Sequence, residues 1–194
     1  MLKQGCFAVL LASVLFCLYG CVGGIWTGAT MVYDRHNVYK KLDDYSLNIK
    51  VNNAITVDNK FKNNGCVIDI AVFNGDILVS GHVPTTEMKE KLNRRLAKVN
   101  GYRRLFNQVQ VRTEESNLML DSWITAKIRG QMFADDSIDP KAFKIVTSDQ
   151  VVYLMGDVHK EQAEKVINMA RETSDVVRVV KMLKYFTYQD NSVG

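Results

Sequence analysis

The chain repeats one pattern of residues at an interval of about 75 residues. Three stretches of the first half each match a stretch of the second half: 44–51 matches 121–128, 77–83 matches 152–158, and 102–106 matches 176–180. The interval changes by only a few residues along the chain, as expected when one unit is duplicated and its loops shorten. The sequence must therefore fold as two similar units.

The first copy predicts the order helix, strand, strand, helix, strand. Leu47, Val51 and Ile55 recur every four residues, as on one face of a helix. Asn74-Gly75 separates two apolar runs and is a strong hairpin signal, with the second strand ending at Gly81. A second helix then opens after Pro84 and ends at Asn100-Gly101, and residues 105–111 form the last strand.

The second copy repeats this order with different residues. Ile124, Ile128 and Met132 predict its first helix, and residues 143–147 and 151–154 predict its hairpin. The hairpin turn, 148–150, has weaker turn chemistry than Asn-Gly. An amphipathic helix and a β-branched strand follow; the helix is marked by Ala163, Val166, Ile167 and Ala170, and the strand by 176–185. The predicted fold class is α+β, with two tandem sandwiches of two helices on a three-stranded mixed sheet.

The N-terminus carries a short apolar run behind the positive Lys3. Residues 7–18 are too few to span a bilayer, for which about 20 apolar residues are needed, and they have the length of a signal-peptide core. The run ends in Leu18-Tyr19-Gly20-Cys21, which resembles the lipobox of bacterial lipoproteins. We therefore expect Cys21 to be the lipidated first residue of the mature chain. An ordinary secretory signal or an N-terminal anchor that contains Cys21 is the alternative.

These patterns divide the chain into six segments. We expect a lipoprotein signal peptide, a lipidated tether, a first domain, a linker, a second domain and a disordered tail, at 1–20, 21–44, 45–112, 113–119, 120–186 and 187–194. The signal removes two cysteines and Cys21 would carry lipid, so Cys66 remains alone and cannot form an internal disulfide. Cys66 opens an apolar run, and a buried inert thiol is the interpretation we favour.

Charge and motifs point away from catalysis and nucleic acid. The net charge of +4 is mild and does not predict a nucleic-acid surface. His36, His82 and His159 lack metal-ligand spacing, and no nucleophile elbow or phosphate-binding loop is present. We interpret Gly81 and Gly156 as structural glycines at tightly packed strand ends. The sequence therefore predicts no enzyme, no metal, no cofactor and no small-molecule substrate.

Two successive α-β-β-α-β units behind a lipobox resemble the dual BON-domain lipoproteins of bacteria. The resemblance covers residues 34–186 and the signal, and includes the stretches 121–125 and 152–156. It implies an outer-membrane lipoprotein, lipid-anchored and facing the periplasm, whose second BON domain docks on anionic phospholipid. It also implies a role in envelope integrity and leaves room for envelope protein partners. The chain departs from the family in its aromatic-rich tether and in Cys66.

One flank of the helix predicted around 121–132 suits a membrane surface. Trp123 is one residue away from the Ile124–Ile128 stripe and is therefore turned about 100° from the core. Lys127 follows on the same flank, and Arg129 lies nearby. A partly exposed tryptophan beside cations suits the headgroup zone of an anionic bilayer. The alternative is that Trp123 packs between the two domains.

The leading prediction is thus a lipid-anchored protein that binds anionic phospholipid, with Trp123, Lys127 and Arg129 as the contact residues. The alternative is a protein-binding scaffold, for example a subunit of an outer-membrane or secretion assembly, without direct lipid docking. Liposome binding would separate the two.

Overall fold

The structure is a computed structural model that describes residues 35–57, 59–62 and 65–186. The predicted signal peptide, Cys21, most of the tether and the predicted tail lie outside these residues. The elements of the first half are α2 (Arg35–Thr56), β1 (Val67–Phe73), β2 (Asp76–Val83), α3 (Thr86–Leu96), β3 (Arg104–Asn107) and β4 (Gln110–Val111). Those of the second half are α4 (Leu118–Phe133), the 3-10 helix η1 (Pro140–Ala142), β5 (Phe143–Ser148), β6 (Val151–His159), α5 (Lys160–Glu172) and β7 (Arg178–Phe186).

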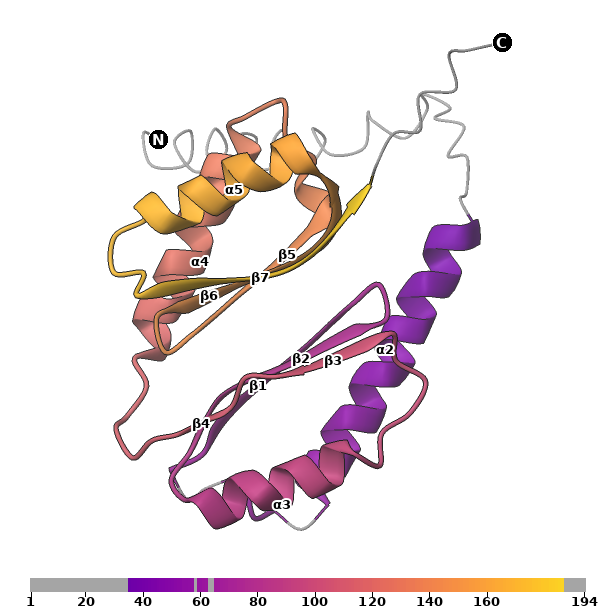
Figure 1. The fold of residues 1–194 in the computed structure, drawn as a ribbon, viewed down its shortest axis with the longest axis vertical. Coiled ribbons are helices and arrows are strands. Elements are labelled where there is room, and N and C mark those ends of the chain that lie inside the picture. The colour runs from indigo at the N-terminus through magenta and orange to yellow at the C-terminus, as the bar shows by residue number, and fades with distance from the viewer. Residues whose placement is uncertain (1–34, 58, 63–64, 187–194) are drawn as a thin grey trace, which may run out of the picture. The chain divides into compact units, whose positions relative to one another are not determined.

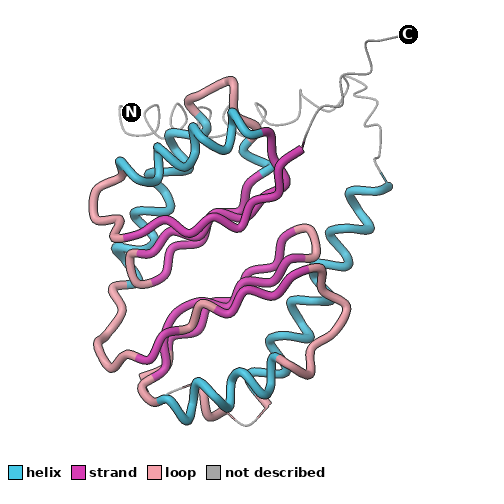
Figure 2. Tube along the Cα trace, in the orientation of Figure 1, coloured by secondary structure: helices cyan, strands magenta, loops and turns pink. Residues whose placement is uncertain are grey.

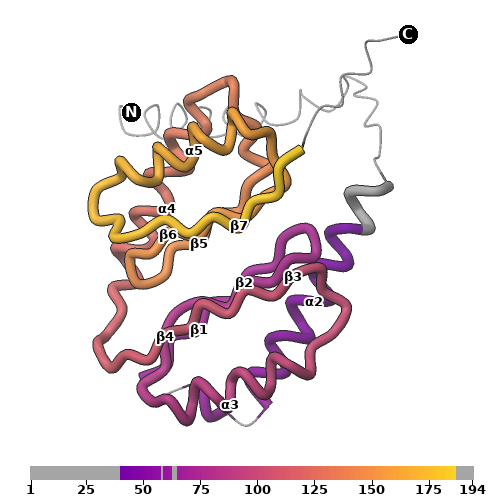
Figure 3. Tube along the Cα trace, viewed as in Figure 1, coloured from indigo at the N-terminus to yellow at the C-terminus, as the bar shows by residue number. Residues whose placement is uncertain are grey.

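Each half forms its own mixed sheet with two helices on one face (Figures 1 and 2). In the first half β1 and β2 are antiparallel, and β2 also pairs in parallel with β3 and β4. In the second half β5 and β6 are antiparallel, and β6 pairs in parallel with β7. Figure 3 shows by colour that one half is built from the earlier residues and the other from the later ones. The predicted α+β class and the strand order of both units are confirmed.

Three helices begin or end at other residues than the sequence pattern indicated. Helix α2 begins at Arg35 instead of near Asp44, so the last part of the predicted tether is helical. Helix α3 ends at Leu96, before Asn100-Gly101, and α4 begins at Leu118, inside the predicted linker. The last strand of the first unit is interrupted between β3 and β4, where the Asn107 side chain accepts a hydrogen bond from the Val109 amide (3.2 Å).

The two structural glycines lie within strands and not at their ends. Gly81 is inside β2 with a φ of +104°, and a Cβ there would stand 2.1 Å from the Val67 carbonyl oxygen. Gly156 is inside β6, where a Cβ would stand 2.6 Å from the Ala142 carbonyl oxygen. A side chain at either position would therefore meet a neighbouring carbonyl, and the strands continue beyond the glycines because the backbone pairing is kept through each of them.

Both hairpin turns are held by an aspartate of the preceding helix. The Asp44 carboxylate accepts hydrogen bonds from the amides of Asn74 (2.8 Å) and Gly75 (2.7 Å). The Asp121 carboxylate does the same for the amides of Asp149 (2.9 Å) and Gln150 (2.8 Å). All four turn residues have positive φ, as a type I′ turn requires. Because Asp44 and Asp121 occupy equivalent positions in the repeat, this device is itself duplicated.

Alternate residues of the central strands face different cores. Ile77 and Val79 of β2 belong to the core of the first unit, and Val152 and Leu154 of β6 belong to the core of the second. The residues between them point to the opposite face of each sheet and meet in a third cluster, formed by Ala71, Leu78, Tyr153, Met155 and Met182. Burial there raises the pKa of the Tyr153 hydroxyl. The two sheets therefore pack face to face.

Polar groups close the interface between the sheets at two places. At one, Arg103 donates to Asp76 (2.7 Å) in its own unit and to Asp157 (2.9 Å) in the other, and Arg104 also contacts Asp76. Burial would raise the pKa of the Asp76 carboxyl, but the hydrogen bonds and charges of the two arginines outweigh it, and the pKa lies below its ordinary value. These contacts fix one end of the interface.

The other polar contact centres on Asp149 of the second unit. Its carboxylate meets the buried His82 ring at 2.9 Å and accepts a hydrogen bond from Ser116. Nearby, Ser148 donates to Asp69 of β1 at 2.7 Å. Burial would raise the pKa of the Asp149 carboxyl, but its hydrogen bonds and the charges of His82 and Arg112 outweigh this and lower it. The pKa of Asp69 is raised, first by burial and further by the charges of Asp121 and Asp149.

Candidate membrane-contact surface

Helix α4 is apolar on two opposite faces. The Asn117 side chain caps its start by accepting a hydrogen bond from the Leu120 amide (3.0 Å). Ile124, Ile128 and Met132 form the inner face and are buried in the core of the second unit. A surface helix ordinarily carries polar residues opposite such a stripe. In α4 the opposite face is apolar too, which requires an explanation.

The outer face of α4 is a continuous stripe of exposed apolar and small residues. Met119 is 83% exposed, Trp123 63% and Phe133 73%. Ala126 and Gly130 lie between them, and all five follow each other at intervals of four and three residues, which keeps them on one side of the helix. We call these five residues the α4 stripe. Trp123 thus faces outward and does not pack between the two domains, which excludes the alternative placement.

Two cations border the α4 stripe, one on each side. Lys127 and Arg129 are two residues apart and therefore point roughly 200° away from each other around the helix. Their neighbours differ accordingly: the Lys127 amine lies 3.4 Å from the Ser174 hydroxyl, whereas Arg129 lies 3.4 Å from the Ile145 carbonyl oxygen of β5. The sequence placed Arg129 only near the flank of Trp123 and Lys127, and the structure places it on the other side of the stripe. The stripe is instead enclosed between two positive charges.

An apolar hollow continues the stripe at its C-terminal end. A cavity of about 240 Å³ is lined by Arg129 and Phe133, with the other lining residues Met132, Pro140, Phe143 and Ile145. The lining is apolar except for the arginine. A methylene chain or a large apolar side chain is the kind of group that could enter there.

Sequence reasoning found part of this surface and missed the rest. It placed Trp123, Lys127 and Arg129 on the right helix, but it did not single out Met119 and Phe133. The missing signal was the four-and-three spacing of residues 119, 123, 126, 130 and 133, which marks a second apolar face on a helix whose first face was already assigned.

The remaining predicted features are placed as follows. Cys66 is partly buried against the first core, and burial raises the pKa of its thiol. Across the described ranges, no three His, Cys, Asp or Glu side chains are arranged to hold a metal ion. Within the same ranges, no helix has both the length and the apolar character needed to cross a bilayer.

Comparison with known proteins identifies the repeat. The model of the BON domain family matches the chain twice, at residues 43–113 and 120–185. The chain is 30% identical to the outer membrane lipoprotein DolP of Haemophilus influenzae, over 92% of this chain and 94% of that one. It is 26% identical to the 21 kDa hemolysin of Actinobacillus pleuropneumoniae, over 80% of this chain and 81% of that protein.

One solved protein shows a distant likeness to the chain. A structural protein of the Chlamydia trachomatis type III secretion system, CdsD, is 17% identical and gives a TM-score of 0.29, with 74% of this chain and 63% of that one covered. The two family matches together span most of the chain, and the likeness to DolP extends over almost its whole length. The protein therefore belongs to the BON domain family, as a two-domain lipoprotein anchored by lipid in the outer membrane.

Proposed function

We propose that the protein is anchored through Cys21, faces the periplasm and rests the α4 stripe on anionic phospholipid, and that this contact supports the integrity of the envelope. The observation that carries the proposal is the exposure of Met119, Trp123 and Phe133 along one face, between Lys127 and Arg129. It combines the two attractions that hold a helix at a bilayer surface, apolar burial and opposite charge.

The chemistry of each residue suits its depth in such a surface. Tryptophan favours the level of the lipid headgroups, where its ring is half in contact with water. Met119 and Phe133 are fully apolar and would enter further. Lys127 and Arg129 stand at the sides of the stripe, where headgroup phosphates would lie, and each basic residue near an anionic surface contributes about 1 kcal/mol. No step of this function requires a catalytic group or a cofactor.

The proposed anchor at Cys21 and the α4 stripe would act together. One acyl chain holds a protein only reversibly, and stable anchoring needs more than one chain or a second contact. We expect a diacylglyceryl group and an amide-linked acyl chain on Cys21. Mass spectrometry of the mature protein tests this, and a mature chain that retains residues 1–20 or an unmodified Cys21 would refute it.

The decisive experiment uses the chain from Val22 to Gly194, because the acyl anchor would hide a weaker contact. Flotation with phosphatidylglycerol-containing and with purely phosphatidylcholine liposomes should show binding only to the former. The Trp123→Ala and Phe133→Ala variants should each bind less. Tyr45→Ala is the matched control, since Tyr45 is an aromatic residue equally exposed on α2. Added salt should weaken binding, because exposed charges are screened within about 8 Å at physiological ionic strength.

Equal binding to neutral and anionic liposomes would refute the proposal, as would Trp123→Ala and Phe133→Ala variants that bind as well as the Tyr45→Ala control. In that case the α4 stripe would be better explained as a contact for a protein, and the scaffold alternative would take precedence. Circular dichroism of each variant separates a lost contact from a lost fold.

A further inference from the structure

Strand β7 is an edge strand whose outer side pairs with no other strand in the described part of the chain. It pairs in parallel with β6 alone. The Val177 amide donates to the Gln150 carbonyl beside the start of β6 (3.0 Å), and the Met182 carbonyl accepts from Arg104 of the other domain (3.3 Å). The hairpin turns the odd-numbered residues of β6 toward β5, and the register pairs Val152 with Val179. The even-numbered residues of β7 therefore bond to β6, and Val179, Lys181, Leu183 and Tyr185 present their backbone groups outward.

This edge is strongly basic. Arg178, Lys181 and Lys184 recur at every third position of β7, all are exposed, and the strand contains no acidic residue. Lysine on an edge strand by itself protects a protein against aggregation. A second observation, at the end of the strand, is needed to indicate a ligand.

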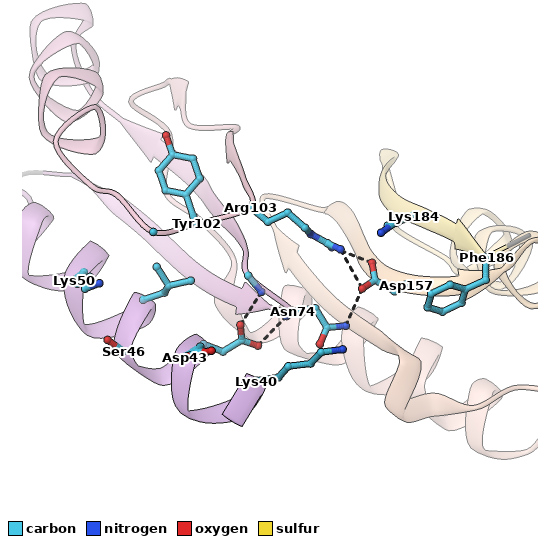
Figure 4. Close-up of a pocket in the computed structure, with 14 residues that line it drawn as sticks. Lys40, Asp43, Ser46, Lys50, Asn74, Tyr102, Arg103, Asp157, Lys184 and Phe186 are labelled. Atoms are coloured by element: carbon cyan, nitrogen blue, oxygen red, sulfur yellow. Dashed lines mark hydrogen bonds and ion pairs between the residues drawn. The ribbon is translucent and has the colours of Figure 1, made fainter. Parts of the chain in front are cut away.

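That observation is a cavity of about 700 Å³ where β7 ends (Figure 4). Lys184 and Phe186 of β7 line it together with Lys40 and Lys50 of α2, and Tyr102 completes the wall. Figure 4 shows these residues around the hydrogen bonds of Asn74, Arg103 and Asp157.

The cavity has spare positive charge. Two of its carboxylates are already engaged, because Asp44 accepts the amides of the Asn74-Gly75 turn and Asp157 accepts from Arg103. Asp43 is the remaining acid among the lining residues. Lys40, Lys50 and Lys184 form no ion pair with any carboxylate of the residues that the structure describes. An incoming acidic group would meet these three amines without displacing an existing partner.

We propose that the outer edge of β7 binds an extended, acidic segment of a partner protein by strand addition, and that the end of this segment enters the cavity beside Lys184. Backbone hydrogen bonds to the edge would supply affinity, and the basic side chains would select an acidic sequence. The surface uses elements other than α4, so this binding does not depend on the lipid contact proposed above.

The probe is a fluorescent peptide of alternating glutamate and valine, as long as β7, with a lysine–valine peptide of equal length for comparison. Fluorescence anisotropy with the full-length lipidated protein in neutral detergent should show binding of the acidic peptide only. Lys181→Gln keeps the backbone amide and removes the charge. Lys181→Pro removes both, and proline is tolerated where the amide faces outward from an edge strand.

We expect Lys181→Gln to weaken binding of the acidic peptide moderately and Lys181→Pro to weaken it by about tenfold, which is the loss of one hydrogen bond and one exposed ion pair together. The Lys40→Gln and Lys50→Gln double variant should weaken it as well, whereas Lys89→Gln on α3 should not. Flotation of the same variants with anionic liposomes should be unchanged. Absence of binding, equal binding of the lysine–valine peptide, or a folded Lys181→Pro variant that binds like Lys181→Gln would each overturn the proposal.

Discussion

Two glycines of this protein occupy opposite environments and give opposite predictions. Gly81→Ala would force a Cβ against the Val67 carbonyl in a left-handed backbone, and we expect a loss of about 3 kcal/mol or more. Gly130→Ala adds a methyl group on α4 with no atom within 4 Å, and we expect a gain of about 0.5–1 kcal/mol from helix propensity. Urea unfolding measures both. A Gly81→Ala protein as stable as the parent would refute the close-packing role.

Gln150 is the least suitable residue in the second hairpin turn. Its φ is +61°, a conformation that costs a residue with a side chain roughly 1–2 kcal/mol and costs glycine nothing. Gln150→Gly restores the preferred residue of a type I′ turn, and part of the gain is offset by the greater freedom of glycine in the unfolded chain. We expect a higher thermal midpoint and a stabilisation of about 0.5–1 kcal/mol. An unchanged or lower midpoint would contradict this.

Among the elements, the two helix-to-turn contacts should differ in importance. Asp121 is buried and holds a turn of Asp149 and Gln150, which rarely form such a turn without help. Asp44 holds Asn74-Gly75, which adopts this turn readily. Asp121→Ala leaves two turn amides unpaired and should lower the free energy of unfolding by about 2–3 kcal/mol. Asp44→Ala should lower it less. Chemical unfolding of the two variants makes the comparison, and an equal or reversed order would contradict it.

The number, type and order of the elements could be predicted from the sequence because each is determined by local periodicity. The spacing of Leu47, Val51 and Ile55 and the Asn74-Gly75 turn are examples. The ends could not. Helix α2 continues back to Arg35 although the positions that would extend the Leu47 stripe, Asp43 and Lys40, are polar. Strand β2 continues through Gly81 because β1 pairs with it on both sides of that residue.

The candidate site was predicted only in part for a similar reason. One helical step placed Trp123 outside the core, but Arg129 was placed only near it. Its direction follows from the two-residue separation from Lys127, which turns the two side chains roughly 200° apart around the helix. The packing of one sheet on the other was also missed. The sequence did contain its signal, because two strands hold continuous apolar runs, Ile77-Leu78-Val79 and Val152-Tyr153-Leu154-Met155. A strand with one solvent-exposed face would instead alternate apolar and polar residues.

For the whole molecule, the carboxylates at the interface predict loss of stability in acid. The pKa of Asp76 and that of Asp149 are lowered in the folded protein, so the stability they contribute is present above the ordinary carboxyl pKa of 3.8 and is lost as the pH falls through the folded values. Asp69 has a raised pKa and acts in the opposite direction, because its contribution grows as the pH falls. The folded pKa values of Asp76 and Asp149 lie below 3.8 and that of Asp69 lies above it, so the free energy of unfolding should decrease as the pH falls below about 4.

Urea unfolding at a series of pH values tests this balance. Asp69→Asn removes the opposing group and should make the decrease steeper, whereas Arg103→Gln weakens the partner of Asp76 and should make it shallower. A slope that is the same in all three proteins would mean that other carboxylates control the acid transition.

The face-to-face packing of the sheets predicts that both domains unfold together, and two neighbouring residues can test this. Ile77 and Leu78 are both fully buried, but Ile77 faces the core of the first domain and Leu78 faces the cluster between the sheets. A buried unpaired carboxylate is strongly unfavourable in either place, but the structural change that exposes it to water differs between the two positions. At position 78 the charge reaches water if the sheets separate, whereas at position 77 it reaches water only if the first domain unfolds.

We therefore expect the parent to show one calorimetric transition. Leu78→Asp should show two transitions at lower temperature, with the circular dichroism of the folded protein retained below them, because each domain keeps its own core. Ile77→Asp should lose part of the helical signal already at low temperature, since α2 and α3 pack on the core that it disrupts. Val57→Asp, at an exposed apolar position, is the control for the added charge. If Leu78→Asp and Ile77→Asp lose the same helical signal, the cluster between the sheets is part of the folding core of the first domain, and the two domains cannot exist apart.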